Sequence, residues 1–197
     1  MKISILLPYK ENFSPEYPGA VSLFVNDTTL VSKYKNNIKV YGSTDFKKIF
    51  KVKYVNIDLK KIIIGSQSKE YINKFIDFER NEASDLIEIH NRPYYLKFLS
   101  KRLNKRYYTL FFHNDPLSME GSKSIADRKF LLSLCYRIVF NSNWSKNRFL
   151  EGLDNKFINS DKLNVFFQSA SKSQISIIKS KKKWITFVGK LNRAKGY

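Results

Sequence analysis

Two histidines stand where this chain is expected to build a ligand site, and the sequence contains no others. His90 and His113 each follow a short apolar stretch, and each opens a polar turn that ends in proline. If both stretches are strands of one parallel sheet, the two imidazoles lie at the same edge, where this class of fold binds its ligands. The alternative is an ordinary strand-end residue with local hydrogen bonds, and this alternative weighs more for His90 than for His113.

Residues 184–197 carry a second arrangement that could do chemistry. Trp184 to Val188 alternates aromatic and β-branched residues, as a buried strand does, and Gly189 breaks it into a basic turn with Lys190 and Lys195. A glycine allows close approach of the backbone, and cations balance the charge of a phosphate. The stretch therefore predicts the start of an α/β unit that receives phosphates.

Metal and thiol chemistry have weaker support in the sequence. Two histidines without a cysteine pair or HExxH spacing provide too few zinc ligands, so we expect no metal and no cofactor. The single cysteine, Cys135, has no partner for an internal disulfide and lies in an apolar run. We interpret it as a core residue rather than a nucleophile, and we expect a cytoplasmic location.

The composition is that of a soluble globular protein. Of 197 residues, 43% are hydrophobic, including 16 Phe and 12 Tyr, which argues against disorder. No apolar run approaches the ~20 residues that a membrane span needs. The first nine residues lack the long apolar core and cleavage site of a signal peptide and instead predict a strand.

A net charge of +19 allows a nucleic acid, an anionic membrane or an anionic substrate as partner. The chain is also rich in Lys, Asn, Ile, Phe and Tyr, the combination that an AT-rich genome imposes without any partner. Clusters such as Lys101-Arg102 and Lys181 to Lys183 could still hold the protein at anionic lipid. The charge alone does not separate these alternatives.

The hydrophobic pattern predicts strands that alternate with helices, which indicates an α/β fold: a Rossmann-like parallel sheet with helices on both faces. Glycine 19 lies just before the first helix, where free backbone N–H groups can accept an anion. The predicted strands span residues 3–7, 38–41, 86–89, 108–112, 137–140 and 162–167, with a strand or short hairpin within 44–66. The predicted helices span residues 21–34, 69–80, 94–103, 124–136 and 143–150.

The order of five segments resembles the family 4 glycosyltransferases of the GT-B fold. The first four are a glycine loop Tyr17-Pro-Gly-Ala20, two strand ends Leu86-Ile-Glu-Ile-His-Asn-Arg-Pro93 and Thr109-Leu-Phe-Phe-His-Asn-Asp-Pro116, and Arg137-Ile-Val-Phe-Asn-Ser-Asn-Trp144. The fifth, Val188-Gly-Lys-Leu-Asn-Arg-Ala-Lys-Gly196, is similar to the family's G-[RK]-L-x-x-x-K-G. The resemblance implies two Rossmann-like domains, one mainly for the acceptor and one mainly for a nucleotide-sugar donor.

The resemblance also implies a retaining transfer in which cations and helix N-termini stabilise the leaving diphosphate without a metal. By family position, Lys190 and Lys195 would bind the donor phosphates, and Gly19 would approach them from the other domain. His113 would be the catalytic residue, close to the donor sugar. Contacts in the cleft or to a saccharide or glycolipid acceptor would come from His90, Asn91, Arg92 and Asp115.

The chain departs from the family in length. We expect an N-terminal Rossmann-like domain at residues 1–167, a linker at 168–183 and the start of a donor domain at 184–197, without the family's acidic pair. The predicted function is glycosyl transfer in cell-envelope polysaccharide or glycolipid synthesis, by a chain that is inactive alone. Two alternatives stay open: a basic nucleic-acid-binding protein, and a non-catalytic partner subunit of a split glycosyltransferase.

Overall fold

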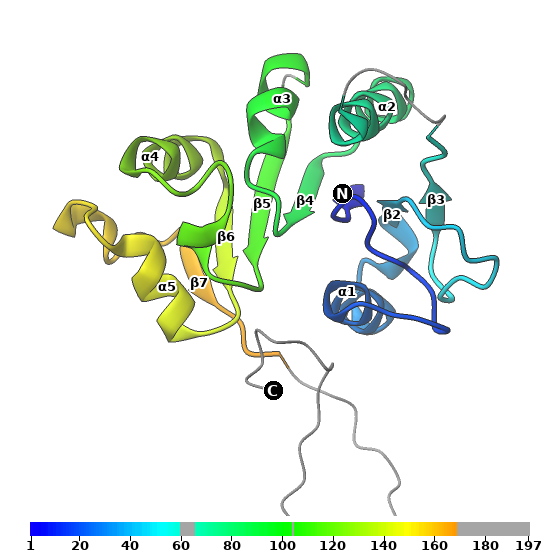
Figure 1. Cartoon of the computed structure of the whole chain (residues 1–197), viewed down its shortest axis with the longest axis horizontal. Helices are drawn as coiled ribbons and strands as arrows, with labels where there is room; N and C mark the ends of the chain where they lie inside the picture. Colours follow the sequence, from blue (N-terminus) through cyan, green and yellow to red (C-terminus); the bar gives the residue numbers. More distant parts are fainter. Residues whose placement is uncertain (60–65, 104, 169–197) are drawn as a thin grey trace, which may run out of the picture.

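A computed structural model describes residues 1–59, 66–103 and 105–168 of the chain. Its strands form one sheet in the order β3-β2-β1-β4-β5-β6-β7, and every neighbouring pair is parallel. Figure 1 shows the sheet, and the strands are β1 (Ile3–Leu6), β2 (Ile38–Gly42), β3 (Tyr54–Asn56), β4 (Leu86–His90), β5 (Tyr107–Phe112), β6 (Arg137–Phe140) and β7 (Leu163–Val165).

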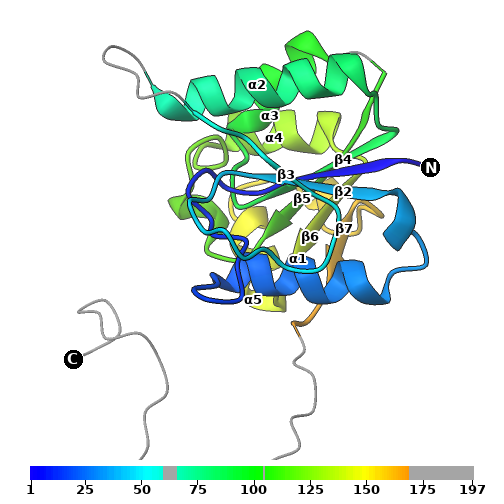
Figure 2. The ribbon, with the colours of Figure 1, turned by 90° about the vertical axis from the view of Figure 1, so that its right-hand side faces the viewer.

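Helices lie on both faces of this sheet. Figure 2 shows α2 (Gln67–Asn81), α3 (Tyr95–Arg102) and α4 (Ile125–Leu134) on one side, and α1 (Ala20–Val31) and α5 (Asn143–Leu150) on the other. Short 3-10 helices follow as η1 (Lys35–Asn37), η2 (Pro116–Ser118) and η3 (Asn155–Phe157). The architecture confirms the predicted α/β, Rossmann-like sheet.

The alternation of side chains along the strands divides the apolar core in two. Leu6 packs with the core on one face, whereas its neighbours Ile5 and Leu7 belong to a smaller cluster with Val21 and Val25 of α1. The strands β1 and β2 therefore contribute to both layers, as a parallel sheet covered on both sides requires. The predicted apolar face of α2 is confirmed, because it is fully buried at Tyr71, Ile72, Phe75 and Ile76.

Residues at both ends of α5 stabilise that helix, and Cys135 lies in the core as predicted. The Ser142 hydroxyl accepts a hydrogen bond from the backbone N–H of Ser145 and so caps α5. Gly152, just beyond α5, has a φ of +74°. Cys135 is fully buried, and burial raises the pKa of its thiol to about 12, as expected of an unreactive core residue.

The strand or short hairpin predicted within residues 44–66 is a strand in the described part of this region. Within residues 44–66 the described part contains the single strand β3, which pairs in parallel with β2 and therefore is not half of a hairpin. The strand β3 lies at the edge of the sheet, where two of its three residues are only partly buried and the third is exposed. Its sequence therefore alternates only weakly between apolar and polar residues. The isoleucines of residues 60–65, the predicted linker beyond residue 168 and the predicted start of a donor domain lie outside the described residues.

The strand order identifies the edge at which a ligand is expected. The chain builds the sheet outward from β1 through β2 to β3, and then continues on the other side of β1 with β4. In open α/β sheets, such a reversal leaves a crevice beyond the carboxyl ends of the two central strands. β4 ends at His90, so the first histidine lies at the reversal.

Candidate functional site

The two histidines meet at the carboxyl edge of the sheet. His90 Nδ1 lies 2.8 Å from His113 Nε2, and the two rings stack with centroids 5.1 Å apart. The parallel pairing of β4 with β5 produces this contact, because it aligns His90 with Phe111, two residues before His113. The prediction that both imidazoles share one edge is confirmed.

Two further side chains extend the pair into a row of four. His90 Nε2 lies 2.8 Å from Oε1 of Glu88, and the amide Nε2 of Gln168 lies 2.7 Å from Nδ1 of His113. His90 is fully buried, whereas the Glu88 side chain is 17% exposed. We refer to Glu88, His90, His113 and Gln168 as the histidine row.

Aromatic side chains enclose the middle of the histidine row. Phe111 stacks on His90 with ring centroids 4.8 Å apart, and Phe24 of α1 meets His113 edge-on at 5.0 Å. Phe166, beyond β7, packs against Phe24. Burial in this setting, together with repulsion from His90, lowers the pKa of His113 to about 3, so the ring is neutral at pH 7.

The lowered pKa predicts loss of stability in acid. Since the pKa of His113 falls from 6.5 in the unfolded chain to about 3 in the fold, its contribution is complete above pH 6.5 and is lost as the pH falls toward 3. We expect the free energy of unfolding to drop by up to about 1.4 kcal/mol per pH unit from this group. Urea titrations between pH 7 and pH 5 measure the slope, and His113→Gln should reduce it. An equal slope in both proteins would contradict the assignment.

Asn91 joins the turns that follow β4 and β5. Its side-chain Oδ1 accepts a hydrogen bond from the backbone N–H of His113 at 2.8 Å, and its own N–H donates to the carbonyl of Phe111. Its φ of +52° is left-handed, which asparagine tolerates better than most residues. Arg92 donates to the carbonyl of Asn91 at 2.8 Å. Both predicted cleft residues thus lie beside the histidines and support the turn that holds them.

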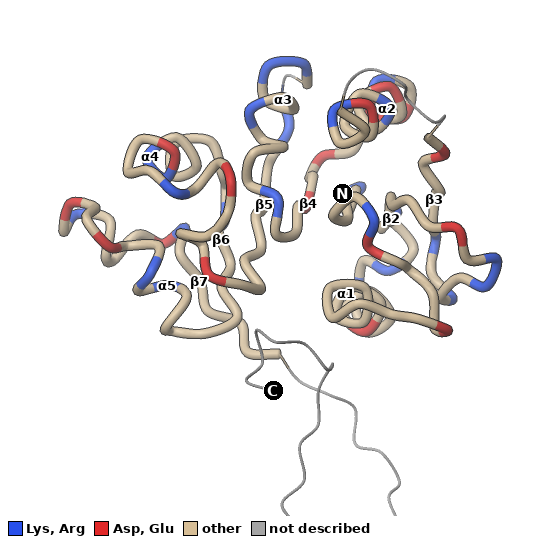
Figure 3. The backbone as a smooth tube through the Cα atoms, in the orientation of Figure 1, with Lys and Arg blue, Asp and Glu red and all other residues tan. Residues whose placement is uncertain are grey.

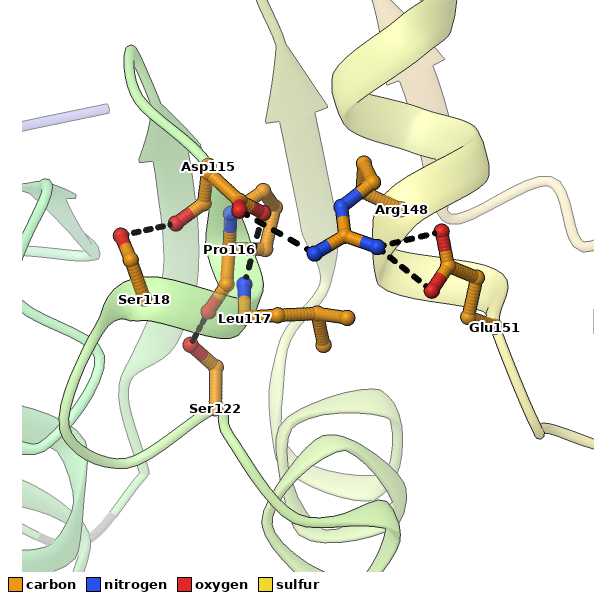
Figure 4. Close-up of polar contacts among 7 residues, drawn as sticks. All are labelled: Asp115, Pro116, Leu117, Ser118, Ser122, Arg148 and Glu151. Atoms are coloured by element: carbon orange, nitrogen blue, oxygen red, sulfur yellow. Dashed lines mark hydrogen bonds and ion pairs between the residues drawn. The ribbon is translucent and has the colours of Figure 1, made fainter.

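The Asp115 side chain contacts the start of η2 and a residue of α5. Figure 4 shows its carboxylate between the start of η2, where it accepts from the N–H of Leu117, and Arg148, whose Nη2 lies 3.3 Å away. Arg148 also donates to both carboxylate oxygens of Glu151. These contacts fix the loop after β5 against α5, so the structure gives Asp115 a supporting role beside the predicted cleft.

At Gly19, a carboxylate occupies the space that a phosphate would need. Gly19 precedes α1 as predicted, but Oε1 of Glu11 accepts from the backbone N–H of Ser22 in the first turn at 3.0 Å. A Cβ built on Gly19 would also meet the Glu11 carboxylate. The helix end therefore does attract an anion, and here that anion is Glu11. A bound phosphate at this place requires Glu11 to move.

This cap predicts a measurable stability change. Glu11→Ala leaves the first turn of α1 without its acceptor and should lower the free energy of unfolding by about 1 kcal/mol, the usual cost of a lost N-terminal cap. Glu16→Ala, an exposed residue in the same loop, is the matched control and should change stability much less. Urea unfolding monitored by circular dichroism measures both. Equal losses would show that Glu11 does not cap α1.

A polar cavity that the sequence did not reveal lies at the same edge, beyond β1, β2 and β3. It has a volume of about 480 Å³ and is lined by Tyr9, Lys10, Asn12, Ser43, Thr44, Asp45, Asn56, Asp58, Leu59 and Gln67. Some of these groups already hold one another: the N–H of Thr44 donates to Oδ1 of Asn56, and its hydroxyl to Oδ1 of Asn12. Hydroxyl, amide and carboxylate groups of this kind are the partners that a saccharide uses.

The remaining predicted site residues, Lys190 and Lys195, lie outside the described part of the chain. Within residues 1–59, 66–103 and 105–168, no three His, Cys, Asp or Glu side chains gather as a metal site would require. None of the helices described is long and apolar enough to cross a membrane. Both statements concern the described residues alone.

Two solved structures have a similar fold: HepE from Anabaena in complex with UDP and glucose, and HepE in complex with UDP. Their TM-scores are 0.58 and 0.54, at 17% and 16% sequence identity. The alignments cover 86% and 85% of this chain but only 45% and 44% of HepE, so the chain spans less than half of the HepE length. At this identity the likeness establishes the fold. Searches of protein-family models and of curated proteins find no match.

Proposed function

We propose that this chain is the acceptor-side half of a glycosyltransferase that uses a nucleotide-sugar donor. The observation that carries the proposal is the coincidence of two features: the fold resembles part of a protein that binds UDP and glucose, and its two histidines meet at the ligand edge of the sheet. UDP and glucose are the two parts of a nucleotide-sugar. The family 4 assignment, the GT-B architecture and the retaining chemistry belong to this proposal.

Within it, the histidine row faces the reacting sugar and the polar cavity receives the acceptor. Among the described residues that line the cavity, Asp45 and Asp58 stand against one cation, Lys10, so the cavity suits a neutral, hydroxyl-rich ligand in spite of the basic chain. Lys190 and Lys195 would hold the donor phosphates in the complete enzyme. A cell-envelope polysaccharide or glycolipid acceptor, with peripheral contact at the inner face of the membrane, agrees with the basic composition.

The nucleic-acid alternative has less support from the distribution of charge. Figure 3 shows Lys and Arg on separate parts of the described chain, with Asp and Glu among them. A nucleic-acid groove, in contrast, usually has one continuous basic stripe. Many of the aromatic side chains are core residues, among them Phe13, Tyr71, Phe75 and Tyr95. They are therefore unable to stack on bases.

Equilibrium binding distinguishes the two functions. The full chain is titrated with UDP-glucose and, separately, with duplex and single-stranded oligonucleotides at two salt concentrations. We expect weak binding of UDP-glucose, through its glucose at the histidine row, and no salt-sensitive binding of oligonucleotides. Submicromolar oligonucleotide affinity that falls steeply with salt, without binding of UDP-glucose, would overturn the proposal.

Catalytic assays test the expected incompleteness of the chain. Because the chain aligns with only 45% of HepE, we expect no sustained release of UDP from UDP-glucose by these 197 residues alone, with or without saccharide acceptors. Steady turnover by the isolated chain would contradict this expectation. Recovery of turnover after addition of a separate donor-domain protein would favour the split-enzyme alternative.

A further inference from the structure

The hydrogen bonds of the histidine row all run in one direction, which the carboxylate of Glu88 determines. We propose that Glu88 and His90 hold His113 in the neutral tautomer protonated at Nε2, so that Nδ1 of His113 accepts a hydrogen bond from a ligand hydroxyl. Glu88 and His90 would then be positioning residues for His113. The identity of the ligand as a sugar rests on the proposed function, whereas the tautomer does not.

The direction follows from counting donors and acceptors. An ionised carboxylate only accepts, so Nε2 of His90, 2.8 Å from Glu88, must donate to it. A neutral imidazole has one N–H, which leaves Nδ1 of His90 as an acceptor for Nε2–H of His113 at 2.8 Å. Nδ1 of His113 is then also an acceptor, and it receives the amide N–H of Gln168 at 2.7 Å. Every link is satisfied in this arrangement, in which both imidazoles are neutral.

The surroundings oppose the other arrangements. His90 is fully buried and stacks on both Phe111 and His113, so its ring has no room to turn. A second proton on His113 would place an imidazolium in an enclosure of aromatic rings beside His90, and the pKa of about 3 agrees with that cost. The groups that face the pair are Glu88 from the strand of His90, Phe111 from β5, Phe24 from α1 and Gln168 after β7.

This arrangement selects the kind of ligand atom that can replace Gln168. The amide N–H of Gln168 stands in for a ligand O–H, since both donate to the lone pair of Nδ1. A phosphate oxygen at the same place would bring its own lone pairs against that of Nδ1 and would be repelled. The row is therefore suited to a sugar hydroxyl, and the phosphates of a nucleotide-sugar must bind elsewhere.

Nitrogen NMR of the full chain tests the tautomer directly. A sample with ¹⁵N-labelled histidine contains only two imidazoles, and a His113→Gln spectrum assigns them. At pH 7.5 we expect both rings to be neutral with the proton on Nε2, seen as one protonated and one unprotonated nitrogen in each ring. A proton on Nδ1 of His113, or a charged His113 at this pH, would overturn the proposal.

Three variants test what sets the direction. Glu88→Ala should convert both rings to mixtures of tautomers, and Glu88→Met, which fills the volume without an acceptor, should do the same if the alanine variant unfolds. Gln168→Ala should shift the Nδ1 resonance of His113 and leave its tautomer unchanged. Glu120→Ala is the control, because Glu120 is exposed, and should change neither histidine. Unchanged tautomers in a folded Glu88 variant would remove Glu88 from its positioning role.

Addition of glucose and of dimethyl phosphate, an anion whose phosphate oxygens carry no proton, to Gln168→Ala separates this inference from the proposed function. We expect glucose to move the Nδ1 resonance of His113 and dimethyl phosphate to leave it unchanged. A shift with dimethyl phosphate would contradict the selectivity argued here. A correct tautomer without any response to glucose would instead contradict the saccharide as ligand.

Discussion

Replacement of Glu79 by alanine should lower the free energy of unfolding by about 3 kcal/mol or more, the usual cost of removing one partner of a buried ionic network. Glu79 is fully buried at the end of α2. Its carboxylate accepts from the hydroxyls of Ser4 and Ser84 and from the N–H of Ser84, and it lies 3.6 Å from Nε of Arg106. Its removal leaves these buried donors without their acceptor and loosens β1 and β4 from α2.

Glu82 supplies the matched control for this experiment. It lies just beyond the same helix and pairs with Lys39, but its side chain is 55% exposed, and solvent weakens such pairs. Glu82→Ala should therefore leave the urea midpoint almost unchanged while Glu79→Ala shifts it strongly. Similar shifts in both variants would show that burial of Glu79 does not determine its contribution.

Gly121→Ala should be comparably severe and should disturb the site itself. Gly121 lies in the loop after β5 with a φ of +87°, and a Cβ at this position would come within 2.6 Å of the backbone nitrogen of Tyr94. Tyr94 follows the turn that carries His90 and Asn91, so the close contact holds the two strand-end loops together. A left-handed alanine costs about 1–2 kcal/mol and the overlap adds about 1–3, for a loss near 3 kcal/mol.

Gly152→Ala separates the cost of the left-handed backbone from the cost of the overlap with Tyr94. Gly152 also has a positive φ, of +74°, but the nearest atom to its Cβ would be the end of the Ile125 side chain at 3.3 Å. We expect this variant to lose only the backbone contribution, about 1 kcal/mol. The same unfolding titrations compare them, and ¹⁵N spectra should show altered histidine resonances in Gly121→Ala alone. Equal losses would mean that the contact with Tyr94 is unimportant.

The sequence predicted the fold because its signals are local. Apolar stretches at residues 86–89 and 108–112, each followed by a polar turn, predict His90 and His113 at one edge, and the sheet confirms this. Glu88 was missed although its position two residues before His90 puts both side chains on one face of a strand. That alternation was the available signal.

Other parts of the site could not be predicted, because they depend on where loops end in space. Gln168 reaches His113 from a segment 55 residues further along the chain, after β7. Glu11 caps α1 across a loop of irregular conformation, with Lys10 at a φ of +68°. The polar cavity draws on loops after three different strands. The spacing of residues in one sequence does not indicate such contacts between distant segments.

The position of the ligand tests the account most directly. ¹H–¹⁵N correlation spectra of the full chain are recorded while UDP-glucose is added. We expect the amide signals that move to cluster at the carboxyl edge, at Asn91 and His113. Signals that move only at the opposite edge, where Met1, Tyr107 and Tyr136 line a separate cavity of about 390 Å³, or no response at millimolar UDP-glucose, would contradict a nucleotide-sugar site at the histidine row.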